Sequence, residues 1–203
     1  IRWNLSDTLV MTQRNLIYYL RQPQLLVFAT IQPIMFLVLF IYVFGGAIAG
    51  SQQDYIQYLL PGILVQTVIF GATQTTVGLA DDLSKGMIDR FRSLPMGRGA
   101  VLAGRTLADA GRGLFSVVIM VAVGTLLGFR FDNGFVNGIL AILLAAGFGF
   151  AFTWISALIG LLVKNPEAAQ VAGFIWVFPL VFASSIFVPT QSMPDWLRVF
   201  AEN

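Results

Sequence analysis

Five long stretches of this sequence contain no ionisable residue. Asp, Glu, Lys and Arg are absent from residues 22–53, 55–80, 113–129, 133–163 and 168–194. Each stretch can hold an apolar helix of roughly 17 to 25 residues, the length that crosses the hydrocarbon of a bilayer. Charged residues make up only 11% of the chain, whereas about a quarter of the residues are charged in a soluble domain. We therefore expect an integral membrane protein.

The predicted fold is all-α. Hydrocarbon offers no water to satisfy backbone N–H and C=O groups, and the five stretches lack the two-residue alternation of barrel strands. We place five membrane-spanning helices at residues 25–44, 59–79, 113–129, 136–162 and 170–188. The third is short, and we expect it to extend into the basic segment before it. The sequence ends just after an amphipathic stretch that includes Trp196 and Phe200, so we expect a sixth span that these residues do not contain.

The basic residues predict how the chain is oriented. Ten of the twelve fall on one side of the predicted spans, and only Arg130 and Arg198 fall on the other. Cytoplasmic loops of membrane proteins carry an excess of Lys and Arg. We therefore expect a multi-pass protein of the cell membrane with its N-terminus and the loop of residues 81–109 in the cytoplasm.

The residue types that are missing exclude several kinds of chemistry. The sequence has no Cys and no His, which excludes disulfides, thiolate or imidazole metal sites, and triads built on Cys or His. None of the predicted spans contains an acid or a base for proton relay or intramembrane catalysis. We expect no catalytic residue, metal or cofactor in this chain. Nucleic acid is not an expected partner, because the basic residues follow membrane topology.

The segment before the first span predicts an amphipathic helix. Four leucines fall on one side of this helix: Leu5, Leu9, Leu16 and Leu20. Three charged residues spaced by seven fall on the other: Asp7, Arg14 and Arg21. Such a helix lies in the interface between lipid and water. It serves either as a simple membrane-surface anchor or as a gate or docking surface, and the pattern does not separate the two.

The loop of residues 81–109 is the longest polar stretch and contains a short two-faced helix. Met87, Phe91 and Leu94 occupy positions i, i+4 and i+7 with Ile88 beside them. Lys85, Asp89 and Arg92 share the opposite face, and Pro95 ends the turn. The helix either lies on the lipid surface or docks in a groove of a cytoplasmic protein.

The second span is unusually rich in neutral polar residues. Gln66 and Gln74 are eight residues apart, and Gln66 and Thr73 are seven apart, so they share a helix face. Such a face would offer hydrogen bonds to an amphiphilic ligand. The candidate substrate-pathway residues are Gln32, Gln66, Thr67, Thr73 and Gln74. The alternative is that these side chains form hydrogen bonds between helices.

Three passages of the sequence resemble a known family. They are YIQYLLPGIL at residues 55–64, DDLSKGMIDRFRSLPM at residues 81–96, and FVP at residues 187–189 followed by MPDWL at residues 193–197. They are similar, in turn, to the entry of the second helix, the cytoplasmic coupling segment, and the external turn and helix before the sixth span. The family is that of the permeases of type-2 ATP-binding-cassette (ABC) exporters, in the daunorubicin-resistance branch.

This resemblance implies a six-helix subunit that pairs with a second permease subunit, identical or different. It also implies a separate ATPase subunit, which carries the ATP and Mg, on the cytoplasmic face. The expected cargo is a hydrophobic or amphiphilic compound: a drug, an antibiotic or a lipid of the cell envelope. The residues implied in ATPase coupling are Lys85, Gly86, Met87, Ile88, Asp89, Arg90, Phe91, Arg92, Leu94 and Pro95.

Two other functions fit the same topology. A secondary transporter or channel would move its substrate on an ion gradient alone, for example with sodium bound by neutral oxygens. A membrane scaffold would bind partners without transport. Spans without ionisable groups, in a chain that has no nucleotide-binding motif, favour a permease driven by partner ATPases.

Overall fold

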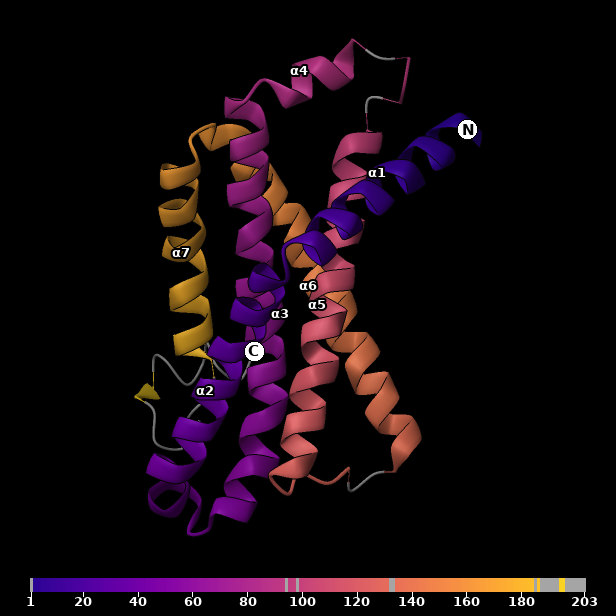
Figure 1. The fold of residues 1–203 in the computed structure, drawn as a ribbon. Coiled ribbons are helices and arrows are strands. Elements are labelled where there is room, and N and C mark those ends of the chain that lie inside the picture. Colours follow the sequence, from indigo (N-terminus) through magenta and orange to yellow (C-terminus); the bar gives the residue numbers. More distant parts are fainter. Residues whose placement is uncertain are drawn as a thin grey trace.

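The computed structural model describes residues 2–93, 95–97, 99–131, 134–184, 186 and 194–195. The described residues form seven helices and confirm the all-α prediction (Figure 1). In chain order the helices are α1 (Arg2–Arg21), α2 (Pro23–Ala49), α3 (Gln52–Ser84), α4 (Met87–Arg92), α5 (Ala100–Leu126), α6 (Phe135–Val163) and α7 (Pro166–Ala183). Five of them, α2, α3, α5, α6 and α7, are long and apolar enough to cross a membrane.

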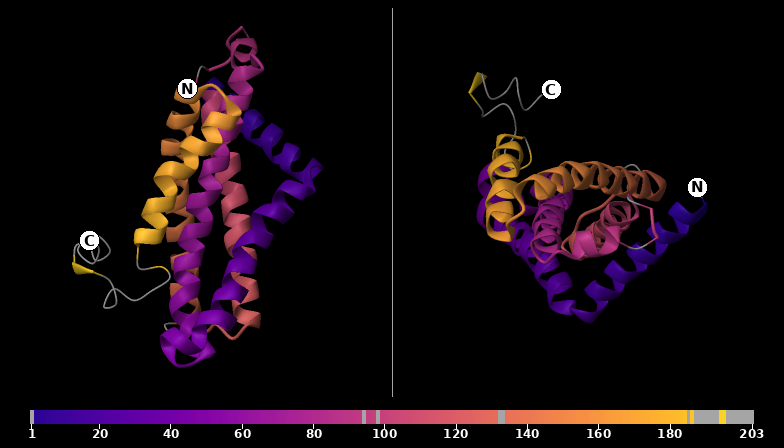
Figure 2. Two further views of the ribbon diagram at one scale, coloured as in Figure 1. Left: turned by 90° about the vertical axis from the view of Figure 1, so that its left-hand side faces the viewer. Right: turned by 90° about the horizontal axis from the view of Figure 1, so that it is seen from above.

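Helix α3 lies at the centre of the bundle. It packs against α2, α5, α6 and α7, and the view from above shows these helices around it (Figure 2). Its first half is fully buried at Tyr55, Ile56, Leu59, Leu60 and Ile63. Most of α2, α6 and α7 faces outward with large apolar side chains, as expected for helices in contact with lipid or with another protein.

The first two helices meet at a sharp corner. Gln22 separates them, and Pro23 begins α2, where proline is favoured because its missing N–H needs no partner in the first helical turn. The residue before a proline avoids the helical conformation, and Gln22 accordingly has φ −121° and ψ 68°. Seen from above, α1 and α2 form a V on one side of the bundle (Figure 2).

The polar segment between the second and third predicted spans is largely helical, and the third span extends into it as predicted. Residues 81–84 continue α3, and α5 begins at Ala100, before the predicted start of the span at residue 113. Residues 100–112 contain no proline, and their small residues pack against α1. Gly104 and Ala108 are buried, and Met11 of α1 lies directly against Gly104. The helix extends because this packing gains apolar burial. The expected loop of residues 81–109 is therefore reduced to the short helix α4 and the connections on either side of it.

The third passage of the resemblance lies mostly outside the described residues. Phe187, Pro189, Met193 and Trp196 lie outside the described residues. The last part of the predicted span at residues 170–188 also lies outside them. Helix α7 itself ends at Ala183.

Candidate functional site

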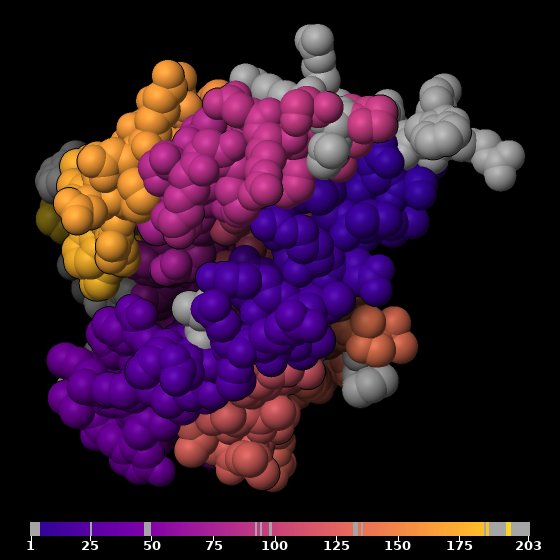
Figure 3. Space-filling view, turned by 45° about the horizontal axis from the view of Figure 1, so that its top comes forward, coloured from indigo at the N-terminus to yellow at the C-terminus, as the bar shows by residue number. Residues whose placement is uncertain are grey.

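A cavity of about 440 Å³ lies between the corner of α1 and α2 on one side and helices α3 and α5 on the other. The space-filling view shows a hollow where indigo α1 and α2 face magenta α3 (Figure 3). Helix α1 contributes Tyr18 and Tyr19 from its last turn, and α2 contributes the aromatic rings of Phe28 and Phe36. The cavity lies at the corner that the helix break at Gln22 creates between α1 and α2.

Four of the five predicted pathway residues line this cavity. Gln66, Thr67 and Gln74 reach it from α3, and Gln32 reaches it from α2. Thr73 does not line it. Thr73 is buried beside Gly173 of α7, and its hydroxyl donates to the carbonyl oxygen of Phe70 at 2.7 Å. The helical spacing placed Gln66 and Gln74 on one face correctly, but Thr73 is turned toward α7.

Gln66 is buried beside the cavity with an unsatisfied oxygen. Its side chain is 7% exposed, and its Oε1 has no hydrogen-bond partner among the described residues. Leaving a buried acceptor unpaired costs about 1 to 3 kcal/mol. A ligand that brings a donor would remove this cost.

On the side of α5, Arg105 and Arg112 line the cavity and belong to a cluster of charged residues. Asp109 is buried at its centre, and each of its carboxylate oxygens accepts a hydrogen bond from a hydroxyl. Tyr19 of α1 donates to Oδ1, and Thr75 of α3 donates to Oδ2 at 2.6 Å. Asp109 therefore joins α1, α3 and α5 at one point.

Two guanidinium groups flank Asp109 without donating hydrogen bonds to it. Arg105 Nε lies 3.8 Å from Oδ2, and Arg112 Nε lies 4.0 Å from Oδ1. Arg105 instead donates from Nη1 to Asp82 of α3 at 2.7 Å. Arg112 donates from Nη2 to the backbone carbonyl of Gly71 at 2.7 Å. The Nε of each arginine is buried and has no partner in the described part of the chain.

The prediction that no ionisable group lies among the spans needs correction here. Arg105, Asp109 and Arg112 belong to the candidate span Ala100–Leu126, and Arg112 contacts Gly71 in the middle of the predicted second span. Their spacing of i, i+4 and i+7 already placed them on one helix face. All three residues precede the predicted span of residues 113–129, because the absence of charge defines the predicted spans.

Tyr19 stays protonated at neutral pH. Burial raises the pKa of its phenol above the ordinary value, and the negative charge of Asp109 raises it further. The ring also faces the Arg112 guanidinium, whose carbon lies 5.6 Å from the ring centre. Tyr19 thus acts as a hydrogen-bond donor that fixes the end of α1 against α5.

The predicted coupling segment lies at one end of the bundle. Gly86 precedes α4 with φ 65°, a left-handed conformation that glycine adopts without strain. Met87 and Phe91 are half-buried and face α1, because the Arg14 guanidinium lies 5.0 Å from the Phe91 ring and 3.7 Å from the Met87 sulfur. Asp7 of α1 also accepts a hydrogen bond from the backbone N–H of Gly97 at 3.0 Å.

The remaining coupling residues differ in exposure. Asp89, Arg90, Pro95 and Lys85 are exposed, and Ile88 is half-buried. Lys85 donates to Asp81 at 2.6 Å, and this hydrogen bond raises the pKa of the lysine. Leu94 and the side chain of Arg92 lie outside what the structure describes.

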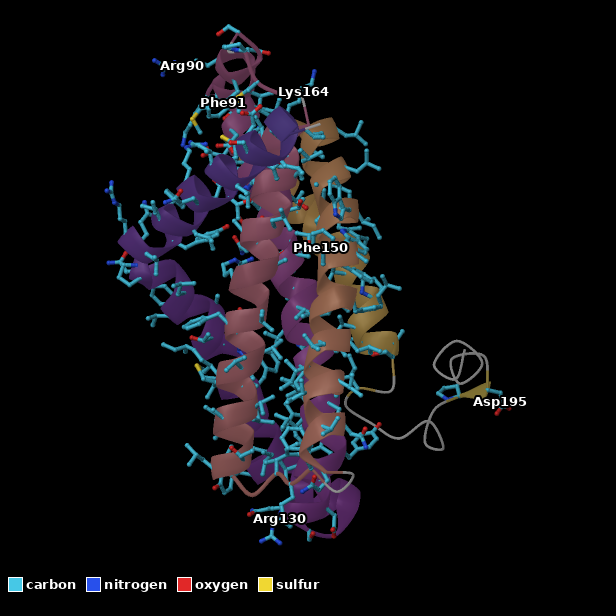
Figure 4. The ribbon with its side chains drawn as sticks, turned by 90° about the vertical axis from the view of Figure 1, so that its right-hand side faces the viewer. Arg90, Phe91, Arg130, Phe150, Lys164 and Asp195 are labelled. Atoms are coloured by element: carbon cyan, nitrogen blue, oxygen red, sulfur yellow. The ribbon has the colours of Figure 1, made fainter. Side chains whose placement is uncertain are left out.

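Basic residues from different loops lie at the ends of the bundle that alternating spans predict. Arg90 and Lys164 lie at one end of the molecule, and Arg130 lies at the opposite end (Figure 4). Lys164 ends α6 in the left-handed conformation, with φ 57°. The end that carries α4 is therefore also the end of the turn between α6 and α7.

Comparison with known proteins identifies relatives over most of the chain. The family described as "ABC-2 type transporter" matches residues 6–202. The daunorubicin resistance ABC transporter permease protein DrrB1 of Streptomyces coeruleorubidus is 38% identical over 97% of this chain and 70% of its own length. The doxorubicin resistance ABC transporter permease protein DrrB of Mycobacterium tuberculosis is 31% identical over 67% of this chain and 50% of its own length.

A further relative in Mycobacterium tuberculosis bears the name "Probable doxorubicin resistance ABC transporter permease protein DrrC". It is 26% identical over 96% of this chain and 71% of its own length. No solved structure matches the chain.

Proposed function

This chain belongs to the ABC-2 type transporter family, and from that premise we propose that it takes amphiphilic compounds into the cavity beneath the α1–α2 corner for export. The chain is a permease subunit of an ABC exporter, and ATP hydrolysis belongs to a separate subunit. The cargo in this proposal is a hydrophobic or amphiphilic drug, antibiotic or envelope lipid. Export starts from the cytoplasm or the inner leaflet.

The cavity lining is the observation that carries the proposal. The aromatic rings of Phe28, Phe36 and Phe70 line the cavity. The side-chain amides of Gln32, Gln66 and Gln74 line the same cavity. Apolar cavities with a few placed polar groups are the usual form of small-molecule sites. A cavity of about 440 Å³ is within the size range of such sites. The relatives named for daunorubicin and doxorubicin resistance support an amphiphile of drug size.

The ATPase partner is proposed to bind at the end that carries α4. Arg90 and Asp89 are exposed there, and Lys164 lies at the same end (Figure 4). Met87 and Phe91 contribute by holding α4 against α1 rather than by entering a groove of the partner. ATP and Mg bind in the partner, and closure of the ATPase pair moves α4. In this proposal the α4 end faces the cytoplasm, in agreement with the excess of basic residues predicted for that side.

A second permease subunit completes the proposed transporter. Outward-facing apolar residues on α6 and α7, such as Leu144, Leu162 and Ile175, offer surface both to lipid and to a partner subunit. The two ABC permeases named DrrB and DrrC in Mycobacterium tuberculosis are both relatives of this chain, and a heterodimer is therefore as consistent with the comparisons as a homodimer.

Reconstitution tests the proposed function against its rivals. The chain, its sister permease and their ATPase are placed in liposomes, and ATP-dependent movement of a fluorescent anthracycline is measured. The control replaces ATP by a non-hydrolysable analogue. Movement on a sodium or proton gradient without ATP would instead support a secondary transporter. An assembled complex that moves no cargo and shows no ligand-dependent ATP hydrolysis would support a scaffold.

A further inference from the structure

We infer that the cavity recognises uncharged hydroxyl or carbonyl groups of its ligand through three side-chain amides, those of Gln32, Gln66 and Gln74. The ligand class is an amphiphile whose neutral polar groups lie beside an apolar body. The inference rests on the proposed function for the place of the site, and it deepens that function by naming the residues that determine specificity. It concerns binding, which can be measured without ATP or transport.

The charged residues that line the cavity already have partners within the protein. These pairs are Asp81 with Lys85, Arg105 with Asp82, and Arg112 with the backbone carbonyl of Gly71. Asp109 lies within 4.0 Å of both arginines and adds the second negative charge that balances them. The ionic groups are therefore balanced by one another, and they do not require a charge on the ligand.

The glutamine amides differ from these ionic groups, because they are open to the cavity. Gln32 of α2 and Gln74 of α3 are exposed, and both line it. Gln66 also lines it, although only 7% of this residue is exposed, and its Oε1 has no hydrogen-bond partner among the described residues. Rotation about the last bond of a glutamine side chain is broad and roughly two-fold. Gln66 can therefore turn either its oxygen or its nitrogen toward a ligand.

Two of the amides lie opposite each other on neighbouring helices. Helices α2 and α3 run in opposite directions (Figure 1), and Gly45 of α2 lies directly against Gln52 of α3. Gln32 lies thirteen residues before Gly45, and Gln66 lies fourteen residues after Gln52. At 1.5 Å per residue these distances bring Gln32 and Gln66 to nearly the same level. Gln74 follows on the same face of α3, eight residues closer to the α4 end.

Two aromatic rings line the cavity one helical turn beyond this pair of amides. Phe28 precedes Gln32 by four residues, and Phe70 follows Gln66 by four. The Phe70 ring packs against Phe174 of α7, with 5.8 Å between the ring centres, whereas Phe28 is 70% exposed. The apolar body of a ligand would pack against these rings while its hydroxyl or carbonyl groups reach Gln32 and Gln66.

The test measures binding of fluorescent probes to the purified permease in phosphatidylcholine nanodiscs. The probes 1-pyrenemethanol and 1-methylpyrene share one ring system and differ by a hydroxyl group. Gln66→Leu is expected to weaken binding of the alcohol about tenfold, or about 1.4 kcal/mol, and to leave the affinity for 1-methylpyrene unchanged. Each probe is compared between proteins, so the difference in lipid partitioning between the probes cancels. Equal changes for the two probes would overturn the inference.

Thermal unfolding separates recognition from structural support. Gln66→Leu removes a buried acceptor that has no partner in the described part of the chain, so its unfolding temperature should be equal to that of the wild type or higher. Gln32→Leu and Gln74→Leu replace exposed residues, and each should weaken binding of the alcohol severalfold. Gln170→Leu replaces an exposed glutamine of α7 outside the cavity lining and is the matched control. A lower unfolding temperature in Gln66→Leu, with both probes weakened alike, would show that the amide joins helices and does not recognise a ligand.

Charged probes test whether recognition is neutral. They are 1-pyrenemethylamine, a cation, and 1-pyrenecarboxylate, an anion. If either binds ten times more tightly than the alcohol, and still does so in Gln66→Leu, the charged residues and not the amides recognise the ligand. Competition then identifies the source of the neutral groups. Displacement of 1-pyrenemethanol by dioctanoylglycerol would support an uncharged lipid as the ligand of the amides, and lack of displacement would support a ring compound of drug size.

Transport distinguishes this inference from the proposed function. Amide-dependent binding of the alcohol, without ATP-driven movement in the reconstituted complex, would leave the ligand site standing and refute export. ATP-driven movement of both neutral probes, with affinities that none of the three glutamine variants changes, would refute recognition by the amides and leave export standing.

Discussion

The guanidinium of Arg14 in α1 lies 5.0 Å from the centre of the Phe91 ring in α4. This contact joins the short helix at the exposed end of the bundle to the helix that reaches the cavity. Five residues after Arg14, the same α1 helix presents Tyr19, which lines the cavity and donates to Asp109. A movement of α4 thus has a direct route through α1 to the charged wall of the cavity.

Removing the aromatic ring from this contact is expected to weaken coupling. In Phe91→Ala the complex should still assemble and hydrolyse ATP, but stimulation of hydrolysis by ligand should fall severalfold, because α4 can then move without α1. The loss in stability should be small, since a cation–π contact near the surface contributes about 0.5 to 1 kcal/mol. Phe150→Ala in α6, which also removes a half-buried ring, is the control. Unchanged ligand stimulation in Phe91→Ala would contradict this route.

Reversing an exposed charge at the α4 end is expected to weaken binding of the ATPase. Arg90→Glu should lower the affinity for the ATPase about tenfold. Like charges brought together at an interface cost up to several kcal/mol, and charges at the rim of an interface cost less. Thermal stability of the isolated permease should not change, since Arg90 is exposed. The matched variant Arg130→Glu lies at the other end (Figure 4) and should bind the ATPase normally. Pull-down with purified ATPase measures both, and equal losses would argue against this docking surface.

The close packing of α1 on α5 should not tolerate a methyl group. A Cβ at Gly104 would lie 2.5 Å from the Cβ of Met11 and 2.9 Å from the backbone nitrogen of Thr12. Gly104→Ala is therefore expected to cost about 1 to 3 kcal/mol, the usual effect of overpacking. Gly147→Ala in α6 meets nothing within 4 Å and should be neutral or slightly stabilising. Thermal unfolding in detergent compares the two, and a Gly104→Ala protein as stable as Gly147→Ala would refute the packing.

The buried charges of α5 should be more costly to remove singly than together. Arg112→Ala leaves Asp109 with less compensation, and breaking a buried pair in this way typically costs about 3 to 5 kcal/mol. Adding Asp109→Asn should restore part of the loss, because no unbalanced charge then remains at that point. The free energies of unfolding of the two single variants and the double variant are compared. If Asp109→Asn destabilises Arg112→Ala as much as it destabilises the wild type, the two residues are not coupled.

The Tyr19 hydroxyl predicts a loss of stability at alkaline pH. Its folded-state pKa is raised, chiefly by burial, so the folded protein holds this proton more tightly than the unfolded chain does. The contribution of Tyr19 to the free energy of unfolding is fully present below the pKa of about 10 that tyrosine has in the unfolded chain. This contribution decreases as the pH rises above that value. Tyr19→Phe cannot titrate, so its unfolding temperature should fall less than that of the wild type between about pH 9 and about pH 11. Parallel curves for the two proteins would contradict the buried phenol.

Much of the fold could be predicted because lipid imposes simple rules on sequence. The five apolar helices and their alternation followed from the absence of charge. That alternation is also why Arg90 and Lys164 share one end while Arg130 lies at the other. Part of the site followed from helical periodicity, which placed Gln66 and Gln74 on one face of α3. Periodicity fixes angles around one helix axis, so it could not tell that Thr73 faces α7 instead.

The sequence by itself determined which segments are helices in a membrane and at which end each loop lies, since charges are too costly to place in hydrocarbon. Only the tertiary structure decided where Arg105, Asp109 and Arg112 lie. As isolated residues before an apolar span they resemble the end of a loop. Packing of α1 and α3 on α5 encloses them, because hydroxyls of Tyr19 and Thr75 and the carbonyl of Gly71 replace the water that these charges would otherwise need. Those partners lie 34 to 90 residues away along the chain, and no local pattern in the sequence brings them together.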